Sequence, residues 1–252
     1  MTVVLLAVLV SQRSGMMQVK GAHAPSPTPI SASFDRNVVT REVCLPEEAW
    51  YTIQTGVFSQ REAAQEKAAA YADRGAPGTV VEDGGKWRVF IASYGSEADA
   101  SAVRQRLGEM QRVETYLYPW KCPELRLRLT GMAGQLDVAE AGLTLFGSAA
   151  ALLRDTATQL DAAQLTAEEA ARVIDDLSGQ ISLWAETTRD RFGRNAPELV
   201  QQLLLRADAW VDRAAALKAA SSSAQELSAA LKGQGMQMYD EEILLRRALN
   251  GS

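Results

Sequence analysis

A strand-then-helix pattern occurs twice within residues 51–107, at a spacing of 36 residues. Residues 51–58 (YTIQTGVF) are echoed by residues 87–94 (WRVFIASY), with an aromatic side chain at both ends of each copy and β-branched residues at Ile53 and Val89. Each copy is followed by an alanine-rich segment, residues 63–72 and 98–107. Such a repeat indicates one supersecondary unit used twice, and it limits the possible folds more than any other feature of the chain.

Side-chain character alternates along both predicted strands, as it does in a half-buried strand. In the first copy, Ile53 shares a face with residues 51, 55 and 57, whereas Gln54 shares the other face with residues 52 and 56. In the second copy, Trp87, Val89 and Ile91 take the first face, and Arg88, Phe90 and Ala92 take the second. The repeat therefore predicts which side chains lie on each face of a sheet.

Two further strands complete the predicted unit. Residues 78–82 lead through Asp83-Gly84-Gly85 into the Trp87 strand, and glycines tolerate the positive φ of such a tight hairpin. Residues 113–118 alternate again after the second helix. Ser59 with Glu62 and Ser96 with Asp99 have capping-box spacing and predict the two helix starts. The order βαββαβ predicts an α+β fold of the split, ferredoxin-like or RNP-like kind, with a four-stranded antiparallel sheet that has helices on one face and an open second face.

These residues also carry a family resemblance. Gln54, Gly56 and Phe58 in the first copy, with Arg88-Val89 in the second, resemble the SPOR domain (sporulation-related repeat) over residues 49–119. One departure is Ala92-Ser93-Tyr94, where Gly-Pro-aromatic is commoner in the family. The resemblance implies a bacterial cell-envelope protein that binds peptidoglycan, in particular glycan strands stripped of their stem peptides. It also implies a single N-terminal membrane span, extracytoplasmic domains, and action at division septa or during sporulation.

The predicted open face has side chains suited to a glycan, which offers hydroxyls, acetamides, carboxylates and apolar sugar faces. The amide of Gln54 both donates and accepts, and Arg88 presents a planar fork of donors. Aromatic rings on neighbouring strands would form an amphipathic platform. The predicted glycan-binding residues are Gln54, Arg88, Phe90, Tyr116 and Tyr118. The alternative for the two tyrosines is packing under the C-terminal helices.

Two cysteines flank the repeat. Cys44 precedes the first strand and Cys122 follows the last, and in the predicted topology these strands are antiparallel neighbours. A disulfide between Cys44 and Cys122 would clasp the two ends of the domain and would require an oxidising compartment. The alternative is two free thiols.

The remaining segments predict the domain organisation. Residues 1–10 are apolar but too few to cross a bilayer alone, which indicates the remnant of an N-terminal membrane anchor. Residues 11–43 include a Pro/Ser-rich stretch and predict a linker. Residues 44–122 form the repeat domain, and residues 123–252 predict an all-α helical bundle. Thr166 and Glu169 have capping-box spacing, and the last helix is expected to break near Gly233-Gln234-Gly235.

Composition excludes several functions. The net charge is −5, and the third strand lacks the Arg/Lys-Gly-Phe-Gly-Phe-like run of RNA-recognition motifs, which share the βαββαβ order, so nucleic-acid binding is not expected. His23 is the single histidine and lies in the linker, which argues against histidine-based catalysis or metal binding. No cofactor is expected.

The resulting hypothesis is non-catalytic peptidoglycan binding that localises a membrane-tethered helical domain to the wall. The C-terminal helices would offer a surface for another envelope protein. The alternatives are a cell-wall hydrolase, or its accessory, with the repeat domain as targeting arm, and a structural adaptor. A glycosidase needs only two carboxylates, so the composition leaves the hydrolase open.

Overall fold

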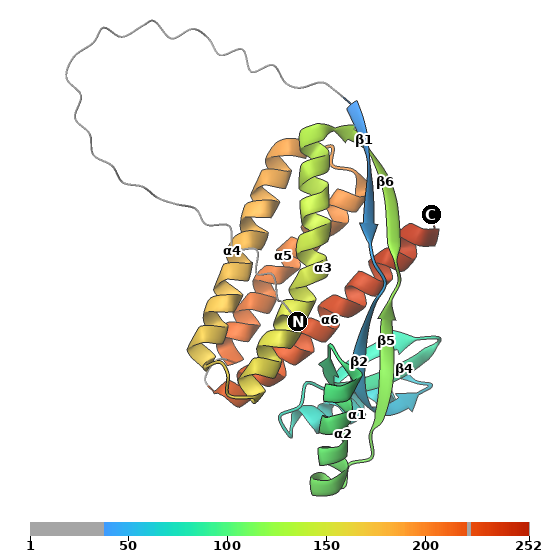
Figure 1. The fold of residues 1–252 in the computed structure, drawn as a ribbon, viewed down its shortest axis with the longest axis vertical. Helices are drawn as coiled ribbons and strands as arrows, with labels where there is room; N and C mark the ends of the chain where they lie inside the picture. Colours follow the sequence, from blue (N-terminus) through green and yellow to red (C-terminus); the bar gives the residue numbers. More distant parts are fainter. Residues whose placement is uncertain (1–37, 221–222, 252) are drawn as a thin grey trace, which may run out of the picture. The chain divides into compact units, whose positions relative to one another are not determined.

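The predicted βαββαβ order is present between residues 48 and 122 of a computed structural model, which describes residues 38–220 and 223–251 (Figure 1). All of them belong to one unit of the chain, Asp35–Ser252. The elements are β1 (Val38–Leu45), β2 (Glu48–Phe58), α1 (Arg61–Ala72), β3 (Thr79–Asp83), β4 (Lys86–Tyr94), α2 (Glu97–Gln111), β5 (Tyr116–Cys122), β6 (Leu125–Met132), α3 (Ala133–Asp161), α4 (Ala167–Phe192), α5 (Glu198–Ala219) and α6 (Ala224–Gly251). The predicted membrane-anchor remnant and most of the predicted linker lie outside the described residues.

Four strands form an antiparallel sheet in the order β3-β4-β2-β5. The turn between β3 and β4 is the predicted hairpin, with positive φ at Gly84 and Gly85. Helices α1 and α2 cover the face predicted for them, since Ile53 and Val89 are buried against alanines and apolar residues of these helices. The pairing of β2 with β4 shifts register on both sides of Gln54, which marks a bulge in the middle of the sheet.

A second sheet was not predicted from the sequence. Strands β1 and β6 pair antiparallel from Val38↔Met132 to Leu45↔Leu125. The linker prediction for residues 38–43 and the all-helix prediction for residues 125–132 are therefore wrong. The missed signal is a strict alternation in β6, where leucines at 125, 127 and 129 alternate with Arg126, Arg128 and Thr130. Val43 and Leu127 from this ribbon pack against the core of the helices.

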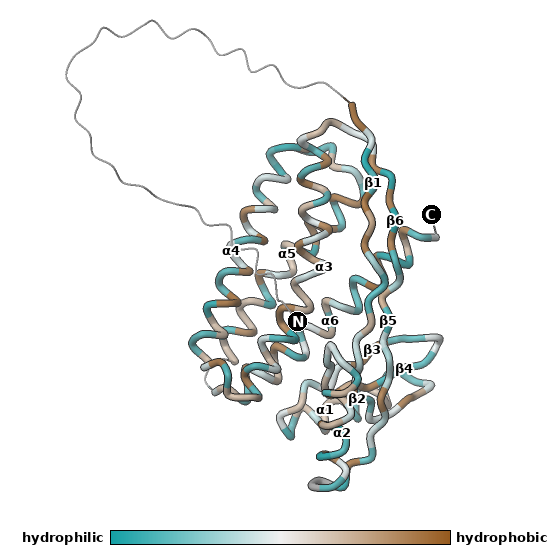
Figure 2. Tube along the Cα trace, in the orientation of Figure 1, coloured by the Kyte–Doolittle hydropathy of each residue, from teal (hydrophilic) through white to brown (hydrophobic). Residues whose placement is uncertain are grey.

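Helices α3 to α6 share one apolar core, and the hydrophobic residues along α4 alternate with hydrophilic ones in Figure 2. The predicted capping box at Thr166 and Glu169 is present. The predicted break in the last helix is wrong, because α6 is continuous through Gly233 and Gly235. A Cβ atom at Gly235 would lie 3.2 Å from the carbonyl oxygen of Ala150, so this glycine allows α6 to approach α3 closely.

The first helix cap also differs from the prediction. Helix α1 begins after Gln60 without a side-chain cap, so the Ser59–Glu62 box does not form. Ser96 does cap α2, since its hydroxyl oxygen accepts a hydrogen bond from the backbone N–H of Asp99. Within the part of the chain that the structure describes, α3 is the one helix long and apolar enough to cross a membrane, and half of its most apolar window is buried.

The two cysteines are free thiols in the structure, contrary to the predicted disulfide. Cys44 is exposed on β1 opposite Arg126, whereas Cys122 is buried on β5 opposite Glu48. Arg126, the partner of Cys44, follows Cys122 by four residues, which span about 13 Å at about 3.3 Å per extended residue, whereas a disulfide requires Cα atoms closer than about 7 Å. Burial raises the pKa of the Cys122 thiol to about 12, which keeps it protonated.

Candidate glycan-binding face

The sequence predicted that the second face of the four-stranded sheet is open. In the structure this face is covered by α6 and part of α3. Helix α6 contacts β3, β4, β5 and β6, and Figure 1 shows it crossing from the other helices to the strands. Trp50, Phe90 and Trp120 on this face are at most 2% exposed and belong to the same core as the helices. The sheet and the helices are therefore joined by a shared hydrophobic core.

Tyr239 of α6 is the central contact of this covered half. Its ring stacks on Trp50 with centroids 3.9 Å apart and an interplanar angle of 8°, and it meets the edge of Trp120 at 5.1 Å. Its hydroxyl donates to the backbone carbonyls of Glu48 and Trp120, both at 3.1 Å. From α3, the guanidinium of Arg154 lies 4.6 Å from the Trp50 ring. Phe90, a predicted glycan contact, is sealed beneath these groups.

The other half of the face is polar and remains partly accessible. Nη1 of Arg88 donates to Oε1 of Gln54 at 2.9 Å, and Nε of Arg88 donates to Oδ2 of Asp83 at 3.2 Å. The guanidinium lies 4.2 Å from the centroid of the Tyr118 ring, within cation–π range. The structure thus brings three of the predicted residues, Gln54, Arg88 and Tyr118, into one cluster around Asp83.

Asp83 is the residue of this cluster that sequence reasoning missed. Burial opposes its ionisation, but hydrogen bonds donated by the Tyr118 hydroxyl and by Arg88 hold the pKa of its carboxyl below the usual value. The pKa of Tyr118 is raised, first by burial and then by the hydrogen bond to Asp83. Arg247 of α6 also approaches Oδ1 of Asp83, at 3.5 Å. The negative charge of Asp83 therefore holds Arg88 in place and partly neutralises it.

The five predicted residues differ in how much of them a ligand can reach. Tyr116 is 52% exposed and its hydroxyl bonds to Glu114. Arg88 and Tyr118 are partly buried, whereas Gln54 is buried and Phe90 fully so. Tyr116, Tyr118 and Arg88 are therefore the accessible part of the predicted site, and we call these three residues the polar rim.

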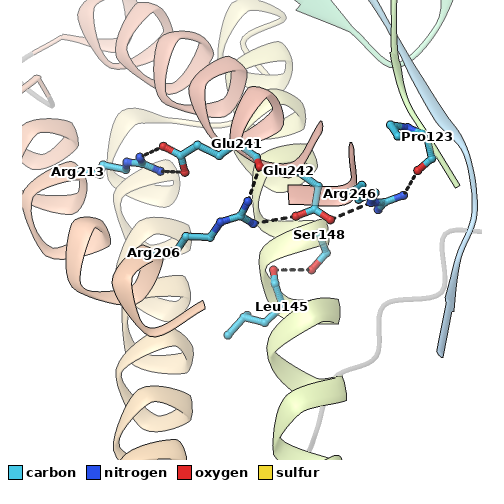
Figure 3. Close-up of polar contacts among 8 residues, drawn as sticks. All are labelled: Pro123, Leu145, Ser148, Arg206, Arg213, Glu241, Glu242 and Arg246. Carbon is cyan, nitrogen blue, oxygen red and sulfur yellow. Dashed lines mark hydrogen bonds and ion pairs between the residues drawn. The ribbon is translucent and has the colours of Figure 1, made fainter. Parts of the chain in front are cut away.

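A buried ion network fixes the sheet to the helices next to this face (Figure 3). Nε of Arg246 donates to Oε1 of Glu242 at 2.8 Å, and Nη1 of Arg206 donates to Oε2 of Glu242 at 2.9 Å. Nη1 of Arg246 also donates to the carbonyls of Pro46 (2.8 Å) and Pro123 (3.1 Å), where β1 passes into β2 and β5 into β6. The i,i+4 spacing of Glu242 and Arg246 was the signal in the sequence for this pair.

No three His, Cys, Asp or Glu side chains within residues 38–220 and 223–251 are grouped to hold a metal ion.

Residues 49–118 match the family model of the SPOR domain, so this segment of the chain is a SPOR domain. SPOR domains are generally peptidoglycan-binding domains, which implies association with the cell wall outside the cytoplasm. Strands β1 and β6 and helices α3 to α6 lie beyond the matched residues. No curated protein and no solved structure shows significant similarity to the chain.

Proposed function

We propose that this chain is a non-catalytic peptidoglycan-binding protein that recognises glycan strands stripped of their stem peptides through the polar rim of its SPOR domain. The observation that supports this most directly is the Arg88 guanidinium, held by Gln54 and Asp83 and stacked on Tyr118, at the accessible end of a SPOR sheet. Arg88 keeps further N–H donors beyond those bonds, because a guanidinium has five.

The rim suits a sugar polymer chemically. The exposed ring of Tyr116 offers apolar surface and a hydroxyl, the combination that makes tyrosine common at amphipathic contacts. The guanidinium fork matches carboxylate and paired carbonyl oxygens such as those of lactyl and acetamide groups. Because Gln54 and Asp83 already orient Arg88, little side-chain entropy is lost when it binds.

In this proposal the helices are carried rigidly by the SPOR domain. Tyr239 and Arg246 join α6 to the sheet through buried contacts, so the helical region moves with the wall-binding part. Membrane attachment through residues 1–10, localisation to septa or to sporulating cells, and a partner for the helices belong to the same proposal and rest on the family resemblance.

A structural adaptor is the second candidate, and one observation favours it. The aromatic half of the sheet face is filled by the chain's own helices, so Trp50, Phe90 and Trp120 serve folding. The hydrolase alternative gains no such support. In the carboxylate run at residues 240–242, Glu241 and Glu242 form ion pairs with arginines of α5 and α6.

Co-sedimentation with purified peptidoglycan sacculi, with and without prior amidase treatment, tests the proposal. We expect retention to rise on amidase-treated sacculi. Arg88→Ala and Tyr116→Ala should each weaken retention about tenfold, typical for loss of an anchoring arginine or tyrosine. Arg126→Ala is the matched control, because Arg126 is an exposed arginine on β6 outside the SPOR segment.

If the wild-type chain does not co-sediment with sacculi, peptidoglycan binding is disproved and the adaptor is favoured. If Arg88→Ala and Arg126→Ala lose retention equally, the loss reflects only a general effect of charge, and the polar rim is not the binding site. Release of soluble sugar fragments during the incubation would instead support the hydrolase.

A further inference from the structure

Arg247 of α6 reaches the edge of the polar rim from outside the SPOR segment, which ends at residue 118. Its Nη2 atom lies 3.5 Å from Oδ1 of Asp83, and Nε of Arg88 donates to Oδ2 of the same carboxylate at 3.2 Å. The Tyr118 hydroxyl donates to Oδ2 as well. The carboxylate at the end of β3 therefore brings together one arginine of the sheet and one arginine of the covering helix.

The two arginines differ in how accessible they are. The side chain of Arg247 is 50% exposed, against 21% for Arg88. Arg88 is also held by Gln54 and lies against the Tyr118 ring. Among the described residues, the contact with Asp83 is the side-chain hydrogen bond that Arg247 makes. A guanidinium has five N–H donors, so most of those of Arg247 are free to bind a ligand.

The positive charge of these arginines is only partly neutralised. Asp83 supplies one negative charge to two guanidinium groups. Asp240, about two turns earlier on α6, also interacts electrostatically with Arg247, but the two form no ion pair within the described residues. A carboxylate brought by a ligand would therefore find two guanidinium groups beside it, and charge-assisted hydrogen bonds to carboxylates are among the strong ones.

The position of Arg247 is set by the residue before it. Nη1 of Arg246 donates to the backbone carbonyls of Pro46 and Pro123, where the strands of the two sheets join. Arg246 is 4% exposed, so this turn of α6 is fixed against the strands. Because the backbone of Arg247 is already in place, a ligand that binds its side chain orders little else.

We propose that Arg247 is a further ligand-binding residue of the site, which rests on the proposed function and means that a helix outside the SPOR segment completes it. In a glycan strand the stem peptide is joined to the lactyl carboxyl group through an amide bond, so its removal leaves a carboxylate. Arg247, together with Arg88, receives this carboxylate, whereas the neutral amide of an intact strand offers no charge to pair with them. Helix α6 thereby adds to the preference for stripped strands.

Co-sedimentation with two preparations of sacculi tests the role of Arg247. The first is amidase-treated, and the second is the same material after carbodiimide and ammonium have converted its carboxylates into amides. Arg247→Ala should weaken retention on the first preparation about fivefold, the upper range for a partly exposed charge pair. On the second preparation it should bind like wild type, because the group that Arg247 receives is then neutral.

The matched control is Arg189→Ala. The Arg189 side chain is 48% exposed and also pairs with one carboxylate, that of Asp208, between α4 and α5. It should bind both preparations like wild type. Arg247→Lys keeps the charge without the planar fork and should recover part of the retention that Arg247→Ala loses. Thermal melting of both Arg247 variants should match wild type, since half of this side chain is exposed.

The outcomes separate this inference from the proposed function. If Arg88→Ala weakens retention while Arg247→Ala binds like Arg189→Ala, Arg247 is not part of the site and the proposed function stands. If Arg247→Ala loses the same factor on both preparations, it does not receive the carboxylate and the inference is wrong. If the wild type binds neither preparation, both proposals fail. A loss confined to sacculi with free carboxylates, with unchanged melting, supports the assignment.

Discussion

The two faces of the SPOR sheet are both buried, but different parts of the chain bury them. On the first face, Ile53 and Val89 pack against α1 and α2, which come from the same repeated unit as the strands. On the second face, Trp50, Phe90 and Trp120 pack against α3 and α6, which begin 83 and 174 residues after Trp50 along the chain. The first face is closed locally, whereas the second is closed only when the whole chain has folded.

This difference divides the second face into two functional halves. Its aromatic half is committed to the stability of the fold through Tyr239, and its polar half is left at the edge of the covering helix. Alternation along a strand can indicate an open face even where a helix distant in sequence covers that face. An aromatic residue on such a face therefore does not by itself indicate a ligand-binding site. On this face the polar rim is the part that stays accessible, and it is where we propose binding.

Replacing Tyr239, which covers the aromatic half of the second face, should have the largest effect on the free energy of unfolding. Tyr239→Ala removes the stack on Trp50 and leaves the carbonyls of Glu48 and Trp120 without their side-chain donor. We expect a loss of about 4 kcal/mol in the free energy of unfolding, as for other large buried aromatics. Urea denaturation measures it, with exposed Tyr116→Ala as the control, which should stay within about 0.5 kcal/mol of wild type. A loss below about 1 kcal/mol for Tyr239→Ala would mean that α6 does not hold the second face.

The second largest effect on stability is expected from the buried ion network, in which Arg246 joins α6 to the strand junctions at Pro46 and Pro123. Arg246→Met leaves Glu242 buried with Arg206 as its remaining ion-pair partner among the described residues, and removes a donor from the carbonyls of Pro46 and Pro123. Breaking a buried pair in this way typically costs about 3 kcal/mol. The same denaturation should show almost no change for Arg126→Met, whose arginine is exposed. Similar stability of the two variants would contradict a structural role for the network.

The first face offers a smaller test, since its two helices start differently. Ser96→Ala removes the hydroxyl that caps α2 and should lower stability by about 1 kcal/mol. Ser59→Ala, at the equivalent place before α1, should leave stability unchanged because no side-chain cap forms there. Thermal melting of the two variants beside wild type measures this, and equal shifts would show that the two repeats begin their helices alike.

Asp240 of α6 provides a further test, and its effect depends on pH. Burial, and then the neighbouring charge of Glu241, raise its pKa to about 6, from 3.8 in the unfolded chain. The folded state therefore binds the proton more tightly, and this contribution to stability is present below about pH 4 and lost as pH rises through about 6. Asp240→Asn should melt above wild type at pH 7.5, and the difference should vanish near pH 4. A constant difference across this range would show that Asp240 does not titrate near 6.

The predictable parts of the fold are those in which sequence neighbours interact. The β3–β4 hairpin, the helix starts at Ser96 and Thr166, and the face assignments of Ile53, Val89 and Phe90 all follow from spacings of a few residues. The failures concern partners distant in sequence. Strand β1 pairs with β6 some ninety residues away, and Gly235 serves a contact with α3 rather than a break in α6.

The candidate site divides in the same way. Gln54, Arg88 and Tyr118 were correctly placed on one face by alternation, and the structure gathers them around Asp83. Phe90 was placed on the correct face but is sealed by Tyr239 and its neighbours, and nothing in the local pattern distinguishes a sealed ring from an open one.

The sequence by itself determined that the chain holds a SPOR domain, the order of the strands and helices within that domain, and the faces on which Ile53, Val89 and Arg88 lie, because periodicity and turn chemistry act over a few residues. The tertiary structure alone decided how far each face is covered, that the two cysteines do not meet, and which polar side chains stay accessible. Those properties depend on where α6 packs, and that packing is set by the summed burial of residues far apart in the chain.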